Sequence, residues 1–214
     1  MILHPVDFIL SLVLLSVLFS YSAGRVPTLI KLICFQGIVV SIVPFFAGHE
    51  MTSGGTAFTL ATLVIRGIII PFSIYIAVKR VEIQREVGPI IGYRVSILCG
   101  LAIIVAAAFV SQRLNFPMSS LSSLWAAASI ALLITGMFLV MARRNAIAMV
   151  IGYIMMENGI YLIGSGFSAR TRHIVEFGIL LDVLAGVMIM AVILQNIKKT
   201  FDDVDTTLLR TLKD

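Results

Sequence analysis

Long apolar runs alternate with short polar or basic connections along the whole chain. Seven runs reach the roughly 20 residues that a helix needs to cross the hydrocarbon core of a bilayer. To within a few residues they cover 6–23, 27–46, 57–78, 95–111, 122–142, 146–165 and 174–195. The pattern therefore predicts an all-α, polytopic membrane protein with about seven transmembrane helices.

The composition excludes the main classes of soluble chain. The 214 residues are 59% hydrophobic and 13% charged, with a mean hydropathy of +1.06, whereas an ordinary soluble domain is about half apolar and a quarter charged. A disordered chain needs the opposite balance, with low hydrophobicity and high net charge. Cys34 and Cys99 both lie inside apolar runs, which favours packed thiols over a disulfide or a metal pair. Residues 1–7 lack a basic segment, so the first run is expected to be a retained helix rather than a signal peptide.

Basic residues concentrate in alternate connections, which gives the predicted orientation. One side carries Arg25, Lys31, Lys79, Arg80, Arg85, Arg94, Arg143, Arg144, Lys198, Lys199, Arg210 and Lys213. The opposite side carries only Arg113, Arg170 and Arg172. By the positive-inside rule, the N-terminus lies outside and the C-terminus is cytoplasmic. The net charge of +5 is thus interpreted as membrane topology rather than as a nucleic-acid-binding surface.

Four segments follow from this layout. They are a three-helix membrane unit with a cytoplasmic loop (1–94), a fourth helix with an outer loop (95–121), a second three-helix unit (122–199) and a cytoplasmic tail (200–214). The two three-helix units both start outside and end in a basic stretch, which indicates a weak internal repeat. Aligning their ends brings Arg66 near Asp182.

Two carboxylates interrupt the last two apolar runs near the middle of the bilayer. Glu157 lies 11 residues beyond Ala146, about 16 Å into a span of about 30 Å. Asp182 lies 13 residues before Gln195, about 20 Å from the cytoplasmic end. Ionisable groups at this depth are costly and by default mark ion or proton pathways. We therefore predict that the pair forms a proton relay, with a structural hydrogen bond between the helices as the alternative.

A buried arginine accompanies these carboxylates. Arg66 lies near the middle of its run and must be paired with a carboxylate or hydrated by water. Pro71 lacks a backbone N–H and is expected to free a carbonyl within the same helix. Such a charge can tune a carboxylate or hold water, and a static ion pair is the alternative. Lys31, which can snorkel to the cytoplasmic face, and Glu176, near an outer helix end, are accessory candidates.

The motifs of enzyme sites are missing from the sequence. His49 and His173 have no second His or Cys at metal-ligand spacing, and the chain has no Gly-rich phosphate loop, nucleophile elbow or Cys cluster. We therefore predict no catalytic, cofactor-binding or metal-ligating residues, and a membrane enzyme acting alone is not expected.

The C-terminal half carries a family resemblance. The segment ARRNAIAMVIGYIMMENGIYLIG, followed by IVEFGILLDVLAGVMIMAVILQNIKK, resembles the small three-helix K-type (NuoK-like) subunit of respiratory complex I. The shared features are the basic RRN turn, the carboxylate-bearing helix pair and the D-x-x-x-G of Asp182 to Gly186. In the K-type pattern the first carboxylate falls where Ile154 stands here. Glu157 lies one helical turn beyond Ile154, on roughly the same face of the helix. The resemblance therefore implies the relay role for Glu157 because of that shared face and not because of its position in the pattern.

Nearly the whole chain is similar to hydrogenase-4 component E (HyfE-like). The similarity includes Gly152-Tyr153 with Met156-Glu157-Asn158-Gly159, Val175-Glu176-x-Gly178 with Asp182, Arg66 with Pro71, and Phe116-Pro117-Met118. It implies a non-catalytic membrane subunit of a complex I-like, group 4 [NiFe]-hydrogenase-type oxidoreductase in the prokaryotic cytoplasmic (inner) membrane. The chain would carry part of a mid-membrane polar chain that couples electron transfer to proton or sodium translocation.

The same resemblance implies the partners. They would be antiporter-like and quinone-site-like membrane subunits, a peripheral redox arm and membrane lipid, without nucleic acid. Iron–sulfur clusters and a [NiFe] centre would lie in partner subunits, with no cofactor in this chain. The alternatives are a subunit of a cation/proton antiporter complex, a purely structural spacer subunit and a stand-alone transporter, the last weakened by the lack of a clear inverted repeat.

Overall fold

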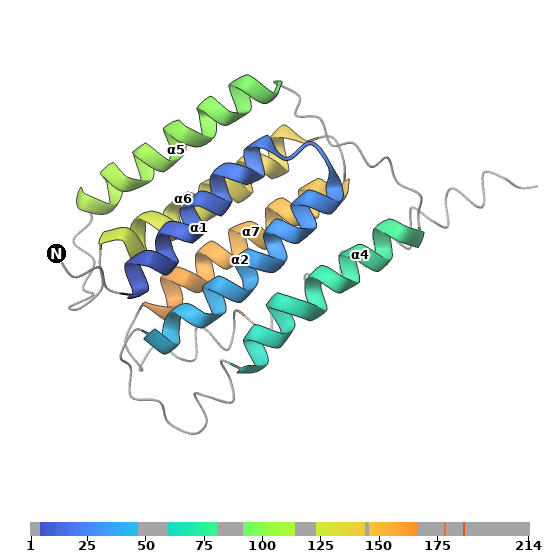
Figure 1. The fold of residues 1–214 in the computed structure, drawn as a ribbon. Helices are drawn as coiled ribbons and strands as arrows, with labels where there is room; N and C mark the ends of the chain where they lie inside the picture. The colour runs from blue at the N-terminus through green and yellow to red at the C-terminus, as the bar shows by residue number, and fades with distance from the viewer. Residues whose placement is uncertain are drawn as a thin grey trace, which may run out of the picture.

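The described part of the chain is a bundle of helices. The computed structural model describes residues 5–46, 60–80, 92–113, 123–143 and 146–166, together with Gly178 and Gly186. Every element in these residues is helical (Figure 1). The elements are α1 (Pro5–Ser22), α2 (Val26–Phe46), the π-helical segment η1 (Ile65–Ile69), α4 (Ile70–Arg80), α5 (Tyr93–Arg113), α6 (Ser123–Ala142) and α7 (Ala146–Ser165).

Five of these helices are long and apolar enough to cross a membrane, namely α1, α2, α5, α6 and α7. They coincide with five of the predicted runs, which confirms an all-helical, multi-pass protein. Within the described residues, the third predicted run forms an apolar helix, Leu60–Ile76, which includes the π-helical segment η1. The seventh run, 174–195, lies outside the described residues except for two helical glycines. Seven spans and the orientation of the termini therefore stay predictions.

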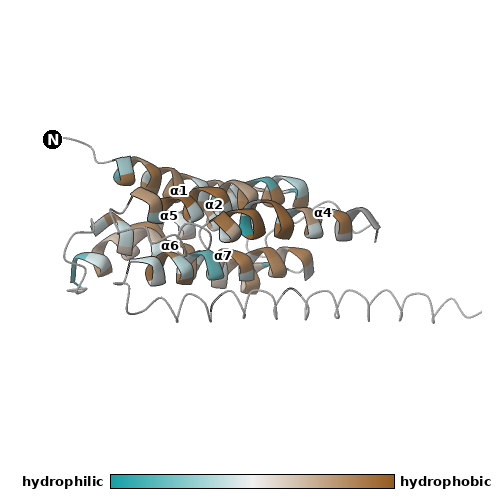
Figure 2. Ribbon diagram, turned by 90° about the horizontal axis from the view of Figure 1, so that it is seen from below, coloured by the Kyte–Doolittle hydropathy of each residue, from teal (hydrophilic) through white to brown (hydrophobic). Residues whose placement is uncertain are grey.

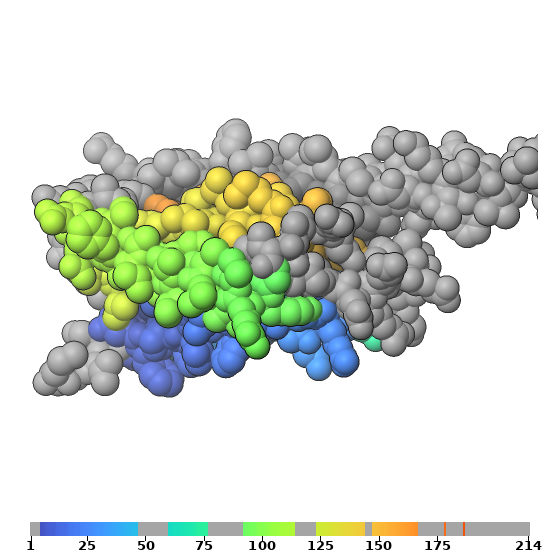
Figure 3. Space-filling model, turned by 90° about the horizontal axis from the view of Figure 1, so that it is seen from above, coloured from blue at the N-terminus to red at the C-terminus, as the bar shows by residue number. Residues whose placement is uncertain are grey.

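The helices form two layers with a helix on each flank. In Figure 1, α1 lies over α6 and α2 lies over α7, with α5 along one edge and α4 along the other. Seen from below, α1, α2 and α4 separate from α6 and α7 (Figure 2). Figure 3 looks onto the flank formed by α5. This arrangement makes α2 and α7 the central pair, bordered by η1 and α4 on one side and by α1 and α6 on the other.

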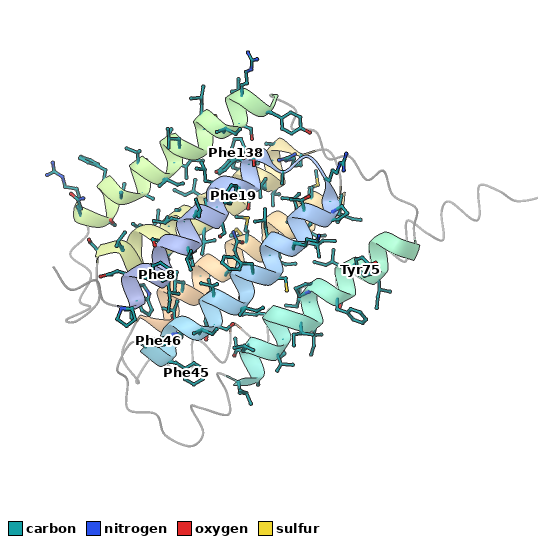
Figure 4. All side chains as sticks on the ribbon, in the orientation of Figure 1. Phe8, Phe19, Phe45, Phe46, Tyr75 and Phe138 are labelled. Atoms are coloured by element: carbon teal, nitrogen blue, oxygen red, sulfur yellow. The ribbon has the colours of Figure 1, made fainter. Side chains whose placement is uncertain are left out.

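The outer surface is apolar, as expected for helices in lipid. Phe8, Phe19, Phe45, Phe46 and Tyr75 are all exposed, and Figure 4 shows the side chains of the bundle. In a bilayer these side chains lose nothing by facing outward, because lipid tails are as apolar as the protein interior. Packing and internal polar contacts must therefore hold the helices together.

Close backbone contact joins α6 to α7. A Cβ added at Gly136 would lie 2.5 Å from Gly152 O, so only glycine fits at this crossing. Near the other end of the pair, Trp125 Nε1 donates a hydrogen bond to Leu162 O over 2.6 Å. Tyr21 on α1 donates to Thr135 Oγ1 on α6 over 3.0 Å. The first two contacts fix the rotation of α7, which carries several of the polar residues described below, and the third joins α1 to α6.

Two buried apolar clusters divide the interior. One cluster joins the first half of α2 to the first half of α7 through Val26, Leu29, Ile30, Ile33, Ile147, Ile151 and Ile154. The other includes the second half of both helices together with α1 and α6, through Val40, Val43, Tyr161, Leu162, Leu10, Val13 and Trp125. Between the two clusters, α2 and α7 each place polar side chains in the interior, and the candidate site lies at that level.

Candidate functional site: a buried polar layer in the middle of the bundle

Arg66 enters the interior from η1 and meets α7. Its side chain is 4% exposed, and Nη1 donates a hydrogen bond to Asn158 Oδ1 over 2.9 Å. Its guanidinium carbon lies 4.7 Å from the centre of the Tyr161 ring, which is a cation–π geometry. The guanidinium is thus held by an amide and an aromatic face. Neither of these two groups cancels its positive charge.

The helix around Arg66 is a π-helical turn followed by a proline. Ile70 N–H donates to Ile65 O, one residue further back than in an α-helix. Pro71 has no N–H to donate to the carbonyl four residues earlier, which is Gly67 O. Cys34 Sγ on α2 donates to this carbonyl over 3.0 Å. The carbonyl that Pro71 frees is therefore satisfied by a side chain from the neighbouring helix.

A glycine on α2 sets how closely η1 approaches. A Cβ added at Gly37 would lie 2.5 Å from Arg66 O, a distance that real side chains essentially never show. Because Gly37 has no side chain, the backbone of η1 rests directly on α2. This close approach brings the Arg66 side chain near enough to α7 to form its hydrogen bond with Asn158.

Helix α7 supplies the other side of the layer. Asn158 is fully buried, Glu157 is 8% exposed and Tyr161 is 7% exposed. Residues three and four apart share one side of a helix, so Tyr161 stands over both Glu157 and Asn158. The hydroxyl of Tyr161 is hydrogen-bonded to Thr62, one turn before Arg66. Asn158 and Tyr161 therefore contact the guanidinium directly, Thr62 bonds to Tyr161, and Glu157 is buried at the neighbouring position of α7.

The predicted site residues fall into three groups. Arg66 and Glu157 are both buried at this level. Lys31 is exposed on α2, away from the buried layer. Asp182 and Glu176 lie outside the described residues, so their place relative to the layer, and the relay role itself, stay predictions.

Sequence reasoning did not select Asn158, Tyr161 or Thr62 as site residues. Asn158 follows Glu157 directly, and an amide beside a mid-span carboxylate is a usable signal. Thr62 lies four residues before Arg66 and Tyr161 four after Glu157, so helical spacing from the two charged residues would have found both.

One further arginine is buried, at the end of α6. Arg143 is fully buried, although the sequence places it among the residues of a basic connection. Burial lowers the pKa of its guanidinium, while a nearby Tyr93 acts in the opposite direction. The first arginine of the RRN turn is therefore part of the packed end of the bundle.

Within the described segments, no three His, Cys, Asp or Glu residues gather closely enough to hold a metal ion. Cys34 and Cys99 are free thiols.

Comparison with known proteins identifies the relatives of this chain. The family model for NADH-ubiquinone/plastoquinone oxidoreductase chain 4L matches residues 124–214, which include almost all of α6 and the whole of α7. The uncharacterized protein Rv0085 of Mycobacterium tuberculosis is 27% identical over 205 residues, covering 95% of this chain and 93% of the relative. Hydrogenase-4 component E of Escherichia coli K12 is 23% identical over 184 residues, covering 84% and 83%. No solved structure matches the chain significantly.

These matches confirm the resemblance found in the sequence. The match to chain 4L falls on the segment that resembles the K-type subunit, and the match to component E extends over most of both chains. The chain is thus similar to hydrogenase-4 component E over most of its length, and its C-terminal part, residues 124–214, matches the chain 4L model.

Proposed function

We propose that this protein is a non-catalytic subunit of a multi-subunit, complex I-like oxidoreductase of the group 4 [NiFe]-hydrogenase type. Its homology to hydrogenase-4 component E and to chain 4L supports a membrane subunit of such a complex. In this proposal, antiporter-like and quinone-site-like membrane subunits lie alongside it in the prokaryotic cytoplasmic membrane. A peripheral arm carries the iron–sulfur clusters and the [NiFe] centre.

The task of this subunit is to carry protons, or sodium ions, across part of the membrane interior. One observation carries this proposal, namely the buried layer in which Arg66 meets Asn158 beside Glu157. A charged side chain at the centre of a bilayer costs at least about 2.5–3.5 kcal/mol. Because burying these charges is costly, an arginine and a glutamate at this depth indicate a functional role.

The reaction that this layer can support is the release and uptake of a proton by Glu157, which changes the charge of its side chain. Asn158 and Tyr161 hold Arg66 without neutralising it, so its positive charge acts on the neighbouring carboxylate. When Glu157 gives up a proton, Arg66 stabilises the carboxylate, and when Glu157 is protonated the arginine keeps its amide and aromatic contacts. Redox steps in partner subunits shift this balance electrostatically. Asp182 then receives the proton as the second group of the relay.

The test replaces each carboxylate by its neutral amide in the assembled complex. Glu157→Gln and Asp182→Asn keep volume and hydrogen-bonding capacity but cannot carry a proton in the same way. The matched control is Ile160→Leu, which changes a residue on α7 that is 52% exposed to the outside. Reconstituted vesicles report ion translocation per electron transferred, and the yield of purified complex reports assembly.

Each outcome assigns the role differently. A relay predicts normal yield and electron transfer with translocation lost in both amide variants and retained in the control. Full translocation in the double variant contradicts the relay. Lost yield with unchanged translocation per complex favours the structural spacer, and co-purification without a redox arm favours the cation/proton antiporter complex.

A further inference from the structure

A second buried polar pair lies on the other side of α2. Gln36 is fully buried at the centre of the 21-residue helix α2, about 15 Å along the axis from Val26. Its Nε2 donates a hydrogen bond to Ser16 Oγ on α1 over 2.9 Å. Ser16 is also buried. The layer described above therefore has a polar counterpart between α1 and α2, which the function proposed so far does not use.

The hydrogen bonds decide which way both buried amides point. Ser16 Oγ donates its proton to Val13 O over 2.6 Å, so it must accept from the Gln36 nitrogen, and Gln36 Oε1 points away from it. Asn158 Oδ1 accepts from Arg66, which can only donate, so the free end of Asn158 is its Nδ2. Among the described residues, both Gln36 Oε1 and Asn158 Nδ2 are buried without a hydrogen-bond partner.

Gln36 and Asn158 come from corresponding turns of two neighbouring helices. Helices α2 and α7 pack against each other, and two residues on each helix bracket the level: Ile33, Val40, Ile154 and Tyr161. The first residue of each pair belongs to one apolar cluster and the second to the other. Gln36 occupies the turn between them on α2, and Asn158 occupies the corresponding turn on α7.

An acceptor and a donor that are both buried without partners are costly, and proteins satisfy such groups with ordered water. We propose that Gln36 Oε1 and Asn158 Nδ2 bind a water molecule between α2 and α7. The water accepts from Asn158 Nδ2 and donates to Gln36 Oε1.

This water deepens the function proposed above and rests on it. It joins the Ser16–Gln36 pair to the Arg66–Asn158 pair, so that the polar groups form one continuous chain from η1 through α7 and α2 to α1. Gln36 acts on ion transfer only through the water and is a positioning residue. The N-terminal helices, which lie outside the segment matched by chain 4L, would then supply part of the conducting layer.

The first test is a density map of the intact wild-type complex at a resolution that shows ordered water. Density for a water within hydrogen-bonding distance of both Gln36 Oε1 and Asn158 Nδ2 is expected. A direct contact between the two amides, or apolar packing in that place, would overturn the proposal. Because this test uses the wild-type complex, it does not depend on whether a variant assembles.

The second test replaces Gln36 by methionine, which has similar length and no hydrogen-bonding amide. The control is Phe35→Leu, at a neighbouring position of α2 that is 41% exposed to the outside. We expect Gln36→Met to lose the water density and to lower ion translocation per electron at least about fivefold relative to the control, as loss of one hydrogen bond in the chain predicts.

The outcomes separate the water from the function on which it rests. If Glu157→Gln stops translocation and Gln36→Met leaves it unchanged, the water has no part in the path and the relay stands. If neither variant changes translocation, both proposals fall.

Discussion

The closest backbone contact of the site offers a sharp test of how the layer is built. Gly37→Ala adds a single methyl group on α2, and that Cβ would lie 2.5 Å from Arg66 O. Ordinary contact begins at about 3.4 Å, so the two backbones must separate by about 0.9 Å. A carbonyl held in a helix cannot turn aside as the end of a side chain can. We therefore expect η1 to move away from α2.

The magnitude follows from two terms. Forcing a methyl group into this packed contact costs about 1–3 kcal/mol. The same displacement, acting along the 2.9 Å bond from Arg66 to Asn158, stretches it to nearly 3.8 Å, which is beyond hydrogen-bonding distance. Loss of a hydrogen bond to a charged group adds about 1.5–3 kcal/mol. Gly37→Ala should therefore lower both the thermal stability of the complex and its ion translocation per electron.

The matched control is Gly24→Ala. Its added Cβ would also lie 2.5 Å from another atom, but that atom is the hydroxyl oxygen of Tyr93, the end of a side chain that is 45% exposed. The ring can swing away, so the control should change stability by less than about 1 kcal/mol. Both variants are compared by thermal unfolding of the purified complex and by translocation in vesicles. Equal stability and equal translocation in the two variants would refute the reasoning.

Substitutions at three further positions test the contacts of the layer one by one. Asn158→Leu leaves the buried guanidinium without its amide and should destabilise the complex by about 3 kcal/mol, measured by thermal unfolding. Tyr161→Phe keeps the aromatic face and loses only the bond to Thr62, so it should lower the stability of the complex by about 1 kcal/mol. Tyr161→Leu also removes the cation–π contact and should lower the stability further. Equal losses of stability in the two variants would argue against that contact. Cys34→Ser retains a donor to Gly67 O and should preserve stability, whereas Cys34→Ala should lower it by about 1 kcal/mol, and a drop of equal size in both would contradict the thiol–carbonyl bond.

Local features of the chain are sufficient to predict the helices and the depth of the charges. A run of about 20 apolar residues is a helix wherever it lies in a bilayer, because the backbone must satisfy its own hydrogen bonds there. Five described helices accordingly coincide with predicted runs. The depths of Arg66 and Glu157 follow from counting residues, since each residue advances the helix by about 1.5 Å. Pro71 likewise predicts a freed carbonyl without any knowledge of the neighbouring helix.

The partners of these groups depend on how the helices are rotated and packed. The sequence predicts a carboxylate or water beside Arg66, and the tertiary structure adds Asn158, which is 92 residues away in the chain. The π-helical turn, the Cys34 donor and the Gln36–Ser16 pair are likewise visible only when α1, α2 and η1 lie together. Apolar residues occur on every side of these helices, so periodicity gives no preferred buried face. Contacts between helices, such as the glycine approach of α2 to η1, decide which polar groups meet.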